Sequence, residues 1–407
     1  MKNKILRVHI FYFLVYVGLI SFLVSYAINS LSYVMFLLFF FCDSRKNIRT
    51  KLKEITNPVV LLFYLLFLSN LIGLVHTTNI DYGLKELMRF APMVFMPLII
   101  ISERRSIVIE RKTINTFSWS LIAILTALII KHILFDDRSI NNFVNYIVND
   151  ELGISQFYVA FLFYIPVLFA LDELIHHKFH WQQIIFIAFF LFGIVLLNNR
   201  TSLLISIPII IKLFWHKIEG PKSVSIKGIG VILIMVIVGV VSLQKYSGIQ
   251  TKLKTISKTT DLSIPVIITK NSITYTANTF EHRILINYLS LGLIKSSFPI
   301  GLGTGDYQDE LNLEYERVHF KYGMTSQFNP HNQYLTEFMK TGVLGGFVFL
   351  CLLYFLGRRV DYKNKLVYSG VVFVFIIGCL FESFLNRQHG IYIFCVIIPL
   401  FFNTVKK

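Results

Sequence analysis

Three polar segments of a largely apolar chain each carry a side chain that can bind phosphate or move protons. Arg200 lies between two apolar runs, Arg283 opens an amphipathic segment, and His331 stands before Asn332 where another apolar run begins. Guanidinium groups bind phosphate oxygens through paired N–H donors and stay charged, so two arginines can neutralise a leaving diphosphate without a metal ion. A nearby histidine can take a proton from an attacking hydroxyl. These residue types suit displacement of a diphosphate by a hydroxyl, with His331 as the candidate general base.

Arg200 and His331 each have a structural alternative. An arginine flanked by hydrocarbon needs an anionic partner or a route to the interface, and either requirement can be met without a substrate. His331 could stand at the start of a helix with its ring bonded to a loop carbonyl. Pro330 favours an extended Asn329 and marks a helix start, so the sequence predicts His331 in the first helical turn. There the helix dipole would favour the neutral imidazole that a base needs.

Two further motifs invite a ligand, but neither has the spacing that a ligand site needs. GLGTGDYQDE (301–310) lacks the Lys-Ser/Thr of a P-loop and the GxGxxG of a dinucleotide site, so we interpret it as a tight turn that lets its loop pack near the sugar. HHKFH (176–180) has no supporting cysteine or carboxylate and is interpreted as interfacial. The four cysteines fall in or beside apolar runs. We expect no disulfide, no metal and no cofactor.

The composition is that of a membrane protein. Of 407 residues, 55% are hydrophobic and 15% are charged, and apolar runs reach about 18 residues or more. A soluble core would interleave polar with apolar residues at helical or strand period, and these runs do not. The sequence therefore predicts an all-α polytopic membrane protein. The net charge of +16 is spread over loops, which indicates orientation in a membrane rather than nucleic-acid binding.

Apolar runs and their breaks predict about twelve transmembrane helices. The first run follows a short basic stretch, but it is too long for a secretory signal and no small-residue cleavage site follows it. Alternate loops are rich in Lys and Arg, which places these loops and both termini in the cytoplasm. The expected spans lie near 8–28, 29–42, 58–75, 84–101, 114–134, 154–171, 182–197, 202–214, 228–243, 333–356, 366–382 and 391–404.

One connection is much longer than the others. Residues 244–332 join the ninth and tenth expected spans on the outer side, and loops this long are usually functional or disordered. Apolar and aromatic residues run through this loop, which argues against disorder, and residues 279–297 are predicted to form an amphipathic helix. The candidate phosphate and proton residues would then all face the outer, periplasmic side.

Four motifs in order resemble the O-antigen ligase and polymerase superfamily of bacterial envelope glycosyltransferases. They are NNRTS from 198, HR from 282 followed by a helix and SSFPIGLGTGDY, PHNQYLTEFMKTGVLGGFVFL from 330, and FESFLNRQHG from 381. The third is the most specific, because it is similar to the family's His-Asn, Leu and Gly-x-x-Gly pattern. The resemblance divides the chain into an N-terminal transmembrane bundle (1–181) and a catalytic region (182–404) that includes the long loop.

The resemblance implies a GT-C-like, metal-independent, inverting transferase in the bacterial inner membrane. It would take a glycan from an undecaprenyl diphosphate carrier and join it to an acceptor hydroxyl at the periplasmic face, with membrane lipid but no nucleic acid as a further partner. On the matching positions, Arg200 and Arg283 would bind the diphosphate, His331 would activate the acceptor and Asn332 would orient His331. Glu382 falls in the last motif without an assigned role.

The motifs leave the acceptor open. A lipid A core as acceptor, which we favour, makes the protein an O-antigen ligase, another lipid-linked repeat unit makes it a polymerase, and a protein serine or threonine is a third option. A transporter of lipid-linked oligosaccharides is the alternative from another class. A transporter should line a central cavity with charges, whereas the mid-span segments are expected to be nearly free of them, and the large outer loop favours catalysis at the surface.

Overall fold

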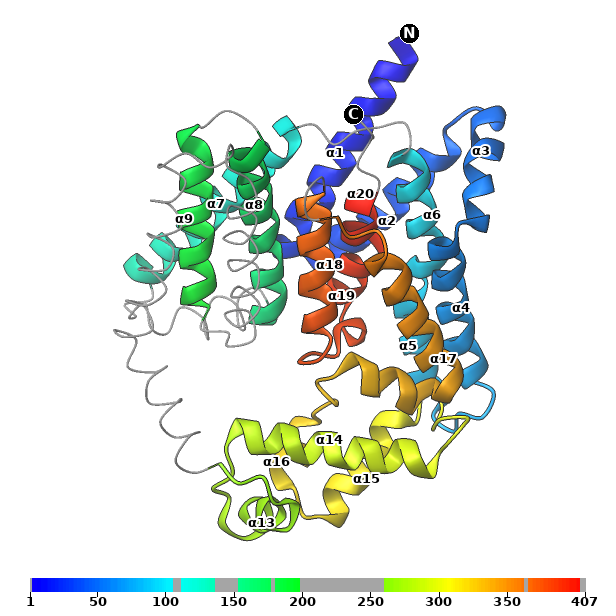
Figure 1. Ribbon diagram of the computed structural model, residues 1–407, viewed down its shortest axis with the longest axis vertical. Coiled ribbons are helices and arrows are strands. Elements are labelled where there is room, and N and C mark those ends of the chain that lie inside the picture. Colours follow the sequence, from blue (N-terminus) through cyan, green and yellow to red (C-terminus); the bar gives the residue numbers. More distant parts are fainter. Residues whose placement is uncertain are drawn as a thin grey trace.

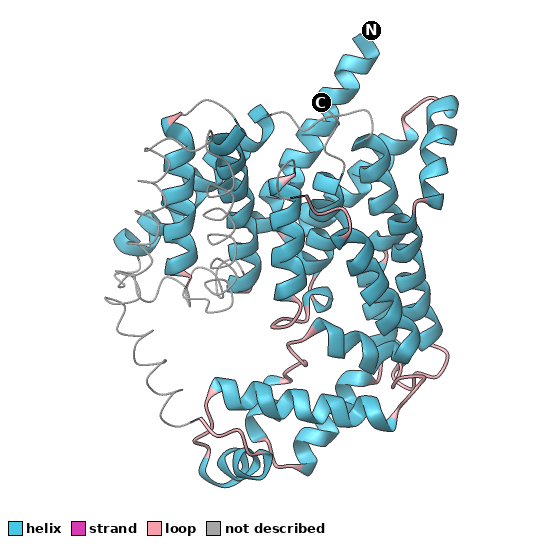
Figure 2. Ribbon diagram, in the orientation of Figure 1, coloured by secondary structure: helices cyan, strands magenta, loops and turns pink. Residues whose placement is uncertain are grey.

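The computed structural model describes residues 2–104, 111–135, 153–176, 180–197, 260–361 and 365–402. Within these ranges the regular elements are all helices and no strand occurs, which confirms the all-helical class (Figure 2). Arg200, the expected spans near 202–214 and 228–243, and the long loop up to residue 259 lie outside the described residues, as does most of the histidine-rich segment.

Helices that correspond to ten of the expected spans pack side by side as a bundle (Figure 1). Phe394, near the end of the chain, packs against Phe63 and Phe349 with ring centroids 4.6 and 6.1 Å away, so distant parts of the chain share one core. The helices are α1 (Lys2–Val24), α2 (Tyr26–Phe41), α4 (Pro58–Gly73), α5 (Ile80–Phe90), α6 (Pro92–Arg104), α7 (Arg111–Phe135), α8 (Gln156–His176), α9 (Trp181–Leu196), α17 (Gln333–Gly357), α18 (Leu366–Gly378), and α19 (Gln388–Tyr392), which continues through a π-helical turn into α20 (Ile398–Phe402).

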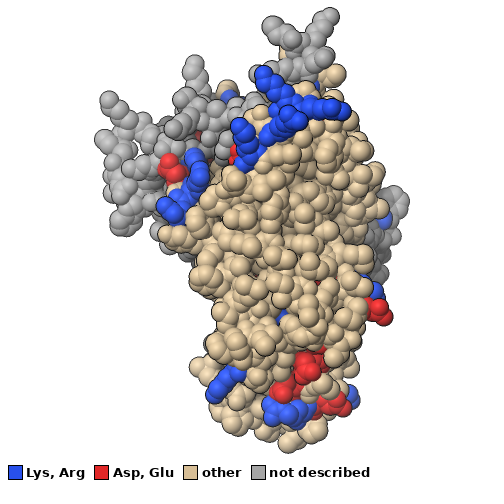
Figure 3. Space-filling model, turned by 90° about the vertical axis from the view of Figure 1, so that its right-hand side faces the viewer, with Lys and Arg blue, Asp and Glu red and all other residues tan. Residues whose placement is uncertain are grey.

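Several of these helices suit a bilayer. By length and composition α1, α7, α8 and α17 can each cross a membrane, and a fifth span results if α2 and the basic helix α3 (Arg45–Leu52), bent by 115°, count as one. Figure 3 shows a broad surface with few charged atoms between the end that carries α3, where Lys and Arg gather, and the opposite end, where both signs occur. The chain is thus a multi-pass membrane protein, and the number twelve stays a prediction.

The expected span at 84–101 is not one continuous helix. It divides at Ala91 into α5 and α6, because Pro92 has no N–H to donate and therefore interrupts the helical hydrogen bonds there. The part before the break is amphipathic, with Glu86 buried and Lys85 exposed. This correction matters for the site, because α5 brings charged side chains to the end of the bundle that faces the glycine-rich turn of residues 301–305.

Residues 260–332 fold into a small helical unit, called the cap below, that covers one end of the bundle (Figure 1). A separate hydrophobic core holds the cap together and includes Leu285, Tyr315 and Phe320. The helix predicted at 279–297 is confirmed as α14. The helices of the cap are α13 (Ile264–Thr269), α14 (Thr279–Ser296), α15 (Tyr307–Arg317) and α16 (Lys321–Ser326).

The glycine-rich motif in the cap is a packing turn, as predicted. Gly301 and Gly303 have φ of 89° and 106°, a left-handed region that favours glycine, and the turn lies between α4 and α17. The Gly303 N–H donates to the carbonyl oxygen of Lys340 (3.0 Å), and the Thr304 N–H donates to that of Gly73 (3.2 Å). These backbone bonds fix the cap on the bundle.

Candidate active site

His331 stands at the junction between the cap and α17. The prediction that it lies in the first helical turn is wrong, because α17 begins at Gln333 and Asn332 is its N-cap. The Asn332 side chain accepts a hydrogen bond from the Leu335 N–H (3.2 Å), and capping of this kind favours asparagine. His331 therefore precedes the helix, with φ of 48° and with its N–H donating to Asn329 Oδ1 (2.9 Å).

The start of α17 is bound to the segment that follows α18, residues 379–386, called the catalytic loop below after the role that we propose for it. The Asn332 N–H donates to Ser383 Oγ (3.2 Å), and the Gln333 N–H donates to the carbonyl oxygen of Cys379 (2.8 Å). The Gln333 side chain accepts from the Leu385 N–H at 2.7 Å. Because these bonds surround Glu382 in the loop and begin one residue after His331, they fix the two side chains relative to each other.

Glu382 faces His331 across this junction. Its Oε2 lies 3.7 Å from His331 Nδ1, which is close enough for electrostatic attraction and slightly too far for a hydrogen bond. Among the residues that the structure describes, Nδ1 is buried without a hydrogen-bond partner, while the histidine side chain as a whole is 26% exposed. The exposed edge of the imidazole is thus the one that points away from Glu382.

Arg283 reaches the catalytic loop from the cap. Its Nη1 donates to the carbonyl oxygen of Phe381 (2.6 Å), one residue before Glu382. Arg283 is placed by the start of α14, where the Asn278 and Glu281 side chains form a capping box with each other's backbone N–H groups. Burial works to raise the pKa of Glu281, but hydrogen bonds from Lys270 and two backbone N–H groups outweigh it and leave the pKa lowered.

The structure brings together three of the five predicted site residues, Arg283, His331 and Glu382, around one short loop. Asn332 is adjacent and acts on the site by capping α17 and by its backbone bond to the loop. Arg200 lies outside the described residues. The sequence placed Glu382 in a motif but gave no sign that it would face His331.

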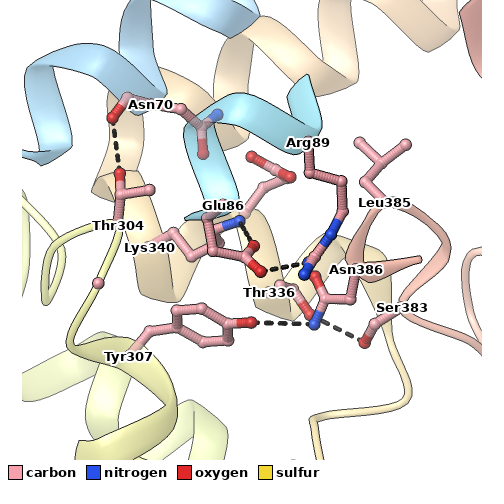
Figure 4. A network of polar contacts seen from close by, with 12 residues as sticks. Asn70, Glu86, Arg89, Thr304, Tyr307, Thr336, Lys340, Ser383, Leu385 and Asn386 are labelled. Carbon is pink, nitrogen blue, oxygen red and sulfur yellow. Dashed lines mark hydrogen bonds and ion pairs between the residues drawn. The ribbon is translucent and has the colours of Figure 1, made fainter. Parts of the chain in front are cut away.

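A buried ionic cluster on the other side of the catalytic loop was missed by the sequence analysis (Figure 4). Lys340 Nζ lies 2.9 Å from Glu86 Oε2, and both side chains are fully buried. Arg89, one turn along α5, also pairs with Glu86 and points toward Asn386 of the catalytic loop (Figure 4). Asn386 in turn donates to the Tyr307 hydroxyl at 3.0 Å. The cluster joins α5, α17, the cap and the loop.

The cluster places charge near the starts of two expected spans, and the expectation that the mid-span segments are nearly free of charge stays a prediction. Glu337 and Lys340 both lie within the expected tenth span, and Glu86 lies within the expected fourth span. The signal was present, because α17 has Gln333, Glu337 and Lys340 at helical spacing on one face. Their partners on α5 could not be assigned from spacing along α17.

The arrangement can perform acid–base and anion chemistry at one place. Glu382 holds negative charge beside one nitrogen of His331, which favours a proton on that side and leaves the other nitrogen to accept one. The Arg283 guanidinium has five N–H donors, so it can hold the Phe381 carbonyl and bind phosphate oxygens at the same time.

Comparison with known families gives a match over part of the chain. Residues 185–350 match the family model described as O-antigen ligase, a range that contains Arg283 and His331. The resemblance to the O-antigen ligase and polymerase superfamily is confirmed. A superfamily of this kind is glycosyltransferase-like and uses a lipid-linked glycan as donor, and the match supports a ligase or a polymerase without separating the two. No curated protein matches the chain.

Proposed function

We propose that the protein is an inverting, metal-independent glycosyltransferase that moves a glycan from undecaprenyl diphosphate to an acceptor hydroxyl, most simply as an O-antigen ligase whose acceptor is a lipid A core. One observation carries the proposal: His331, Glu382 and Arg283, from three separate parts of the chain, meet around one loop. A base, a carboxylate beside it and a guanidinium are the groups that displacement of a diphosphate requires.

In the proposed reaction the acceptor oxygen attacks the anomeric carbon of the glycan as its proton passes to the exposed nitrogen of His331. The bond between that carbon and the diphosphate oxygen breaks, and its electron pair leaves with the diphosphate. Attack from the face opposite the leaving group inverts the anomeric centre. Arg283, and Arg200 from the segment outside the described residues, would neutralise the charge that develops on the leaving diphosphate.

Glu382 has a positioning and electrostatic role in this reaction. The imidazole becomes positively charged when it accepts the proton, and a carboxylate 3.7 Å from Nδ1 stabilises that charge. A hydrogen bond between them would also fix the ring and its tautomer as the base begins to work. Asn332 and Gln333 contribute by holding the loop that carries Glu382.

The proposed location is the bacterial inner membrane, with the cap and the site in the periplasm. This orientation is supported by the exposed arginines and lysines of α3, which lie at the end of the bundle opposite the cap, since basic loops stay in the cytoplasm (Figure 1). α1 begins and α20 ends at the same end as α3, in agreement with two cytoplasmic termini. A lipid-linked donor would then meet the site at the outer membrane–water boundary.

The first test is release of undecaprenyl diphosphate by purified protein given an undecaprenyl diphosphate-linked glycan and an acceptor. Replacing His331 with Ala should reduce release roughly 10²- to 10⁴-fold, the range of general base catalysis, without loss of membrane insertion. His319→Ala is a matched control, because His319 is also a cap histidine with left-handed backbone (φ 55°) but is exposed, whereas His331 is partly buried beside Glu382. Excess chelator should leave release unchanged.

The outcomes of the release assay separate a transferase from a transporter. Release that depends on His331 and on one acceptor would support the transferase and name its class. Undiminished release by His331→Ala would overturn the base assignment, and no release with any acceptor would shift weight to a transporter. Deleting the gene separates the two transferases, because a ligase mutant accumulates long lipid-linked chains and a polymerase mutant caps the lipid A core with single units.

A further inference from the structure

A row of aromatic rings leads away from His331 across the cap. The His331 ring lies 5.8 Å from that of Phe328, and Phe328 lies 6.1 Å from Tyr322, centroid to centroid. Tyr322 lies 5.7 Å from His282, which is adjacent in sequence to Arg283. Four rings from α14, α16 and the segment before α17 are thus linked by successive ring contacts, and this series, called the aromatic row below, starts at the proposed base.

The outer members of the row are not explained by the core of the cap. Phe320, which lies 5.1 Å from His282, is fully buried and belongs to that core, whereas Tyr322 is 62% exposed. Single exposed aromatic side chains are ordinary, but an exposed ring in line with a candidate base is not accounted for by packing. The Tyr322 hydroxyl and the His282 ring nitrogens make no hydrogen bond to any residue that the structure describes.

This combination of groups suits a pyranose sugar. A pyranose presents a face of C–H groups and a rim of hydroxyls. The C–H face packs against the negative face of an aromatic ring, and the hydroxyls need hydrogen-bond partners at the ring's edge. Burial lowers the pKa of His282, which Glu281 partly offsets, so at neutral pH its imidazole is uncharged and offers both a donor and an acceptor.

We infer that the aromatic row is a sugar-binding subsite, in which Tyr322 stacks on a pyranose ring of the glycan and the hydroxyl of Tyr322 and the ring of His282 bond its hydroxyls. The inference rests on the proposed function, since the aromatic row is assigned to the site because it contacts His331, the proposed base. The pyranose belongs either to the donor glycan or to the acceptor glycan, because both must approach the same base.

The kinetic test measures KM for donor and for acceptor separately in the release assay. Tyr322→Ala should raise one of the two KM values roughly 5- to 10-fold and change kcat little, because stacking of this kind contributes to binding rather than to proton transfer. Tyr322→Phe should keep most of the affinity, since the ring remains. A rise in donor KM assigns the row to the donor glycan, and a rise in acceptor KM assigns it to the acceptor glycan.

The matched control is Tyr288→Ala, because Tyr288 is an exposed tyrosine of the cap (52%) on α14 but not a member of the row. An active enzyme in which Tyr322→Ala changes neither KM, or in which Tyr288→Ala changes them equally, would overturn the subsite.

A binding test keeps the subsite separate from the proposed function. Saturation-transfer NMR would use the oligosaccharide released by mild acid from the lipid-linked donor, with the full chain in nanodiscs. Signal from this oligosaccharide that Tyr322→Ala removes, and that His331→Ala retains, supports the subsite even if no acceptor gives turnover. Equal signal with the wild type and Tyr322→Ala refutes the subsite even if turnover depends on His331.

Discussion

Charged side chains flank the catalytic loop on both sides, and the two sides are built differently. On one side Lys340 and Glu86 are 2.9 Å apart and fully buried, with Arg89 paired to the same carboxylate. On the other side His331 and Glu382 are 3.7 Å apart and remain partly exposed, at 26% and 15%. The close, dry pair is suited to holding helices in place, and the open pair is suited to admitting a substrate and a proton. The difference predicts that removing the carboxylate of Glu86 lowers stability, whereas removing that of Glu382 lowers turnover.

The largest effect on stability is expected at the buried pair. Glu86→Gln keeps the shape of the side chain but leaves the Lys340 ammonium buried without the carboxylate it contacts. Breaking one partner of a buried ion pair costs about 3 to 5 kcal/mol of unfolding free energy, which thermal melting in detergent would show. Glu314→Gln is the control, because it removes the same group from an exposed pair with Arg317 and should leave the melting temperature unchanged. Equal melting temperatures for Glu86→Gln and Glu314→Gln would mean that the buried pair does not stabilise the fold.

The next largest effect is on turnover, at the residue that enters the site from the cap. Arg283→Lys keeps the positive charge but loses the paired N–H donors, so release of undecaprenyl diphosphate should fall roughly 10- to 100-fold. The melting temperature should change little, because a lysine at this position can still donate to the Phe381 carbonyl. Near-normal turnover by Arg283→Lys would argue against contact with the diphosphate.

The smallest of these effects is expected at Glu382. Glu382→Gln removes the charge that stabilises the imidazolium while keeping the side chain's size, so kcat should fall roughly tenfold with KM and stability unchanged. Glu382→Asp is the companion variant, because it restores the charge on a shorter side chain and should recover part of the rate. A melting temperature that fell as far as that of Glu86→Gln would show that the two sides of the loop do not differ in role.

Much of the architecture could be predicted from the sequence, because the signals are local. The length of the apolar runs predicted the helices of the bundle, and the residue pattern at 279–297 predicted α14 closely. Local rules also gave the packing turn at Gly301 and Gly303. Where local signals competed, the prediction failed. Pro330 indicated a helix start at His331, but the capping preference of Asn332 set the start of α17 instead.

The sequence by itself determined that this is a helical membrane protein with His331 and Arg283 as candidates, because residue type, apolar length and charge asymmetry are properties of single segments. Only the tertiary structure decided which groups meet. Glu86 and Lys340 are 254 positions apart, and Arg283 is 98 positions from the carbonyl it holds. Such pairs arise from how helices pack, and the local sequence around either residue does not indicate which distant residue it contacts. For that reason no role could be assigned to Glu382 from the sequence. Its position beside His331 follows from the packing of the catalytic loop against the start of α17.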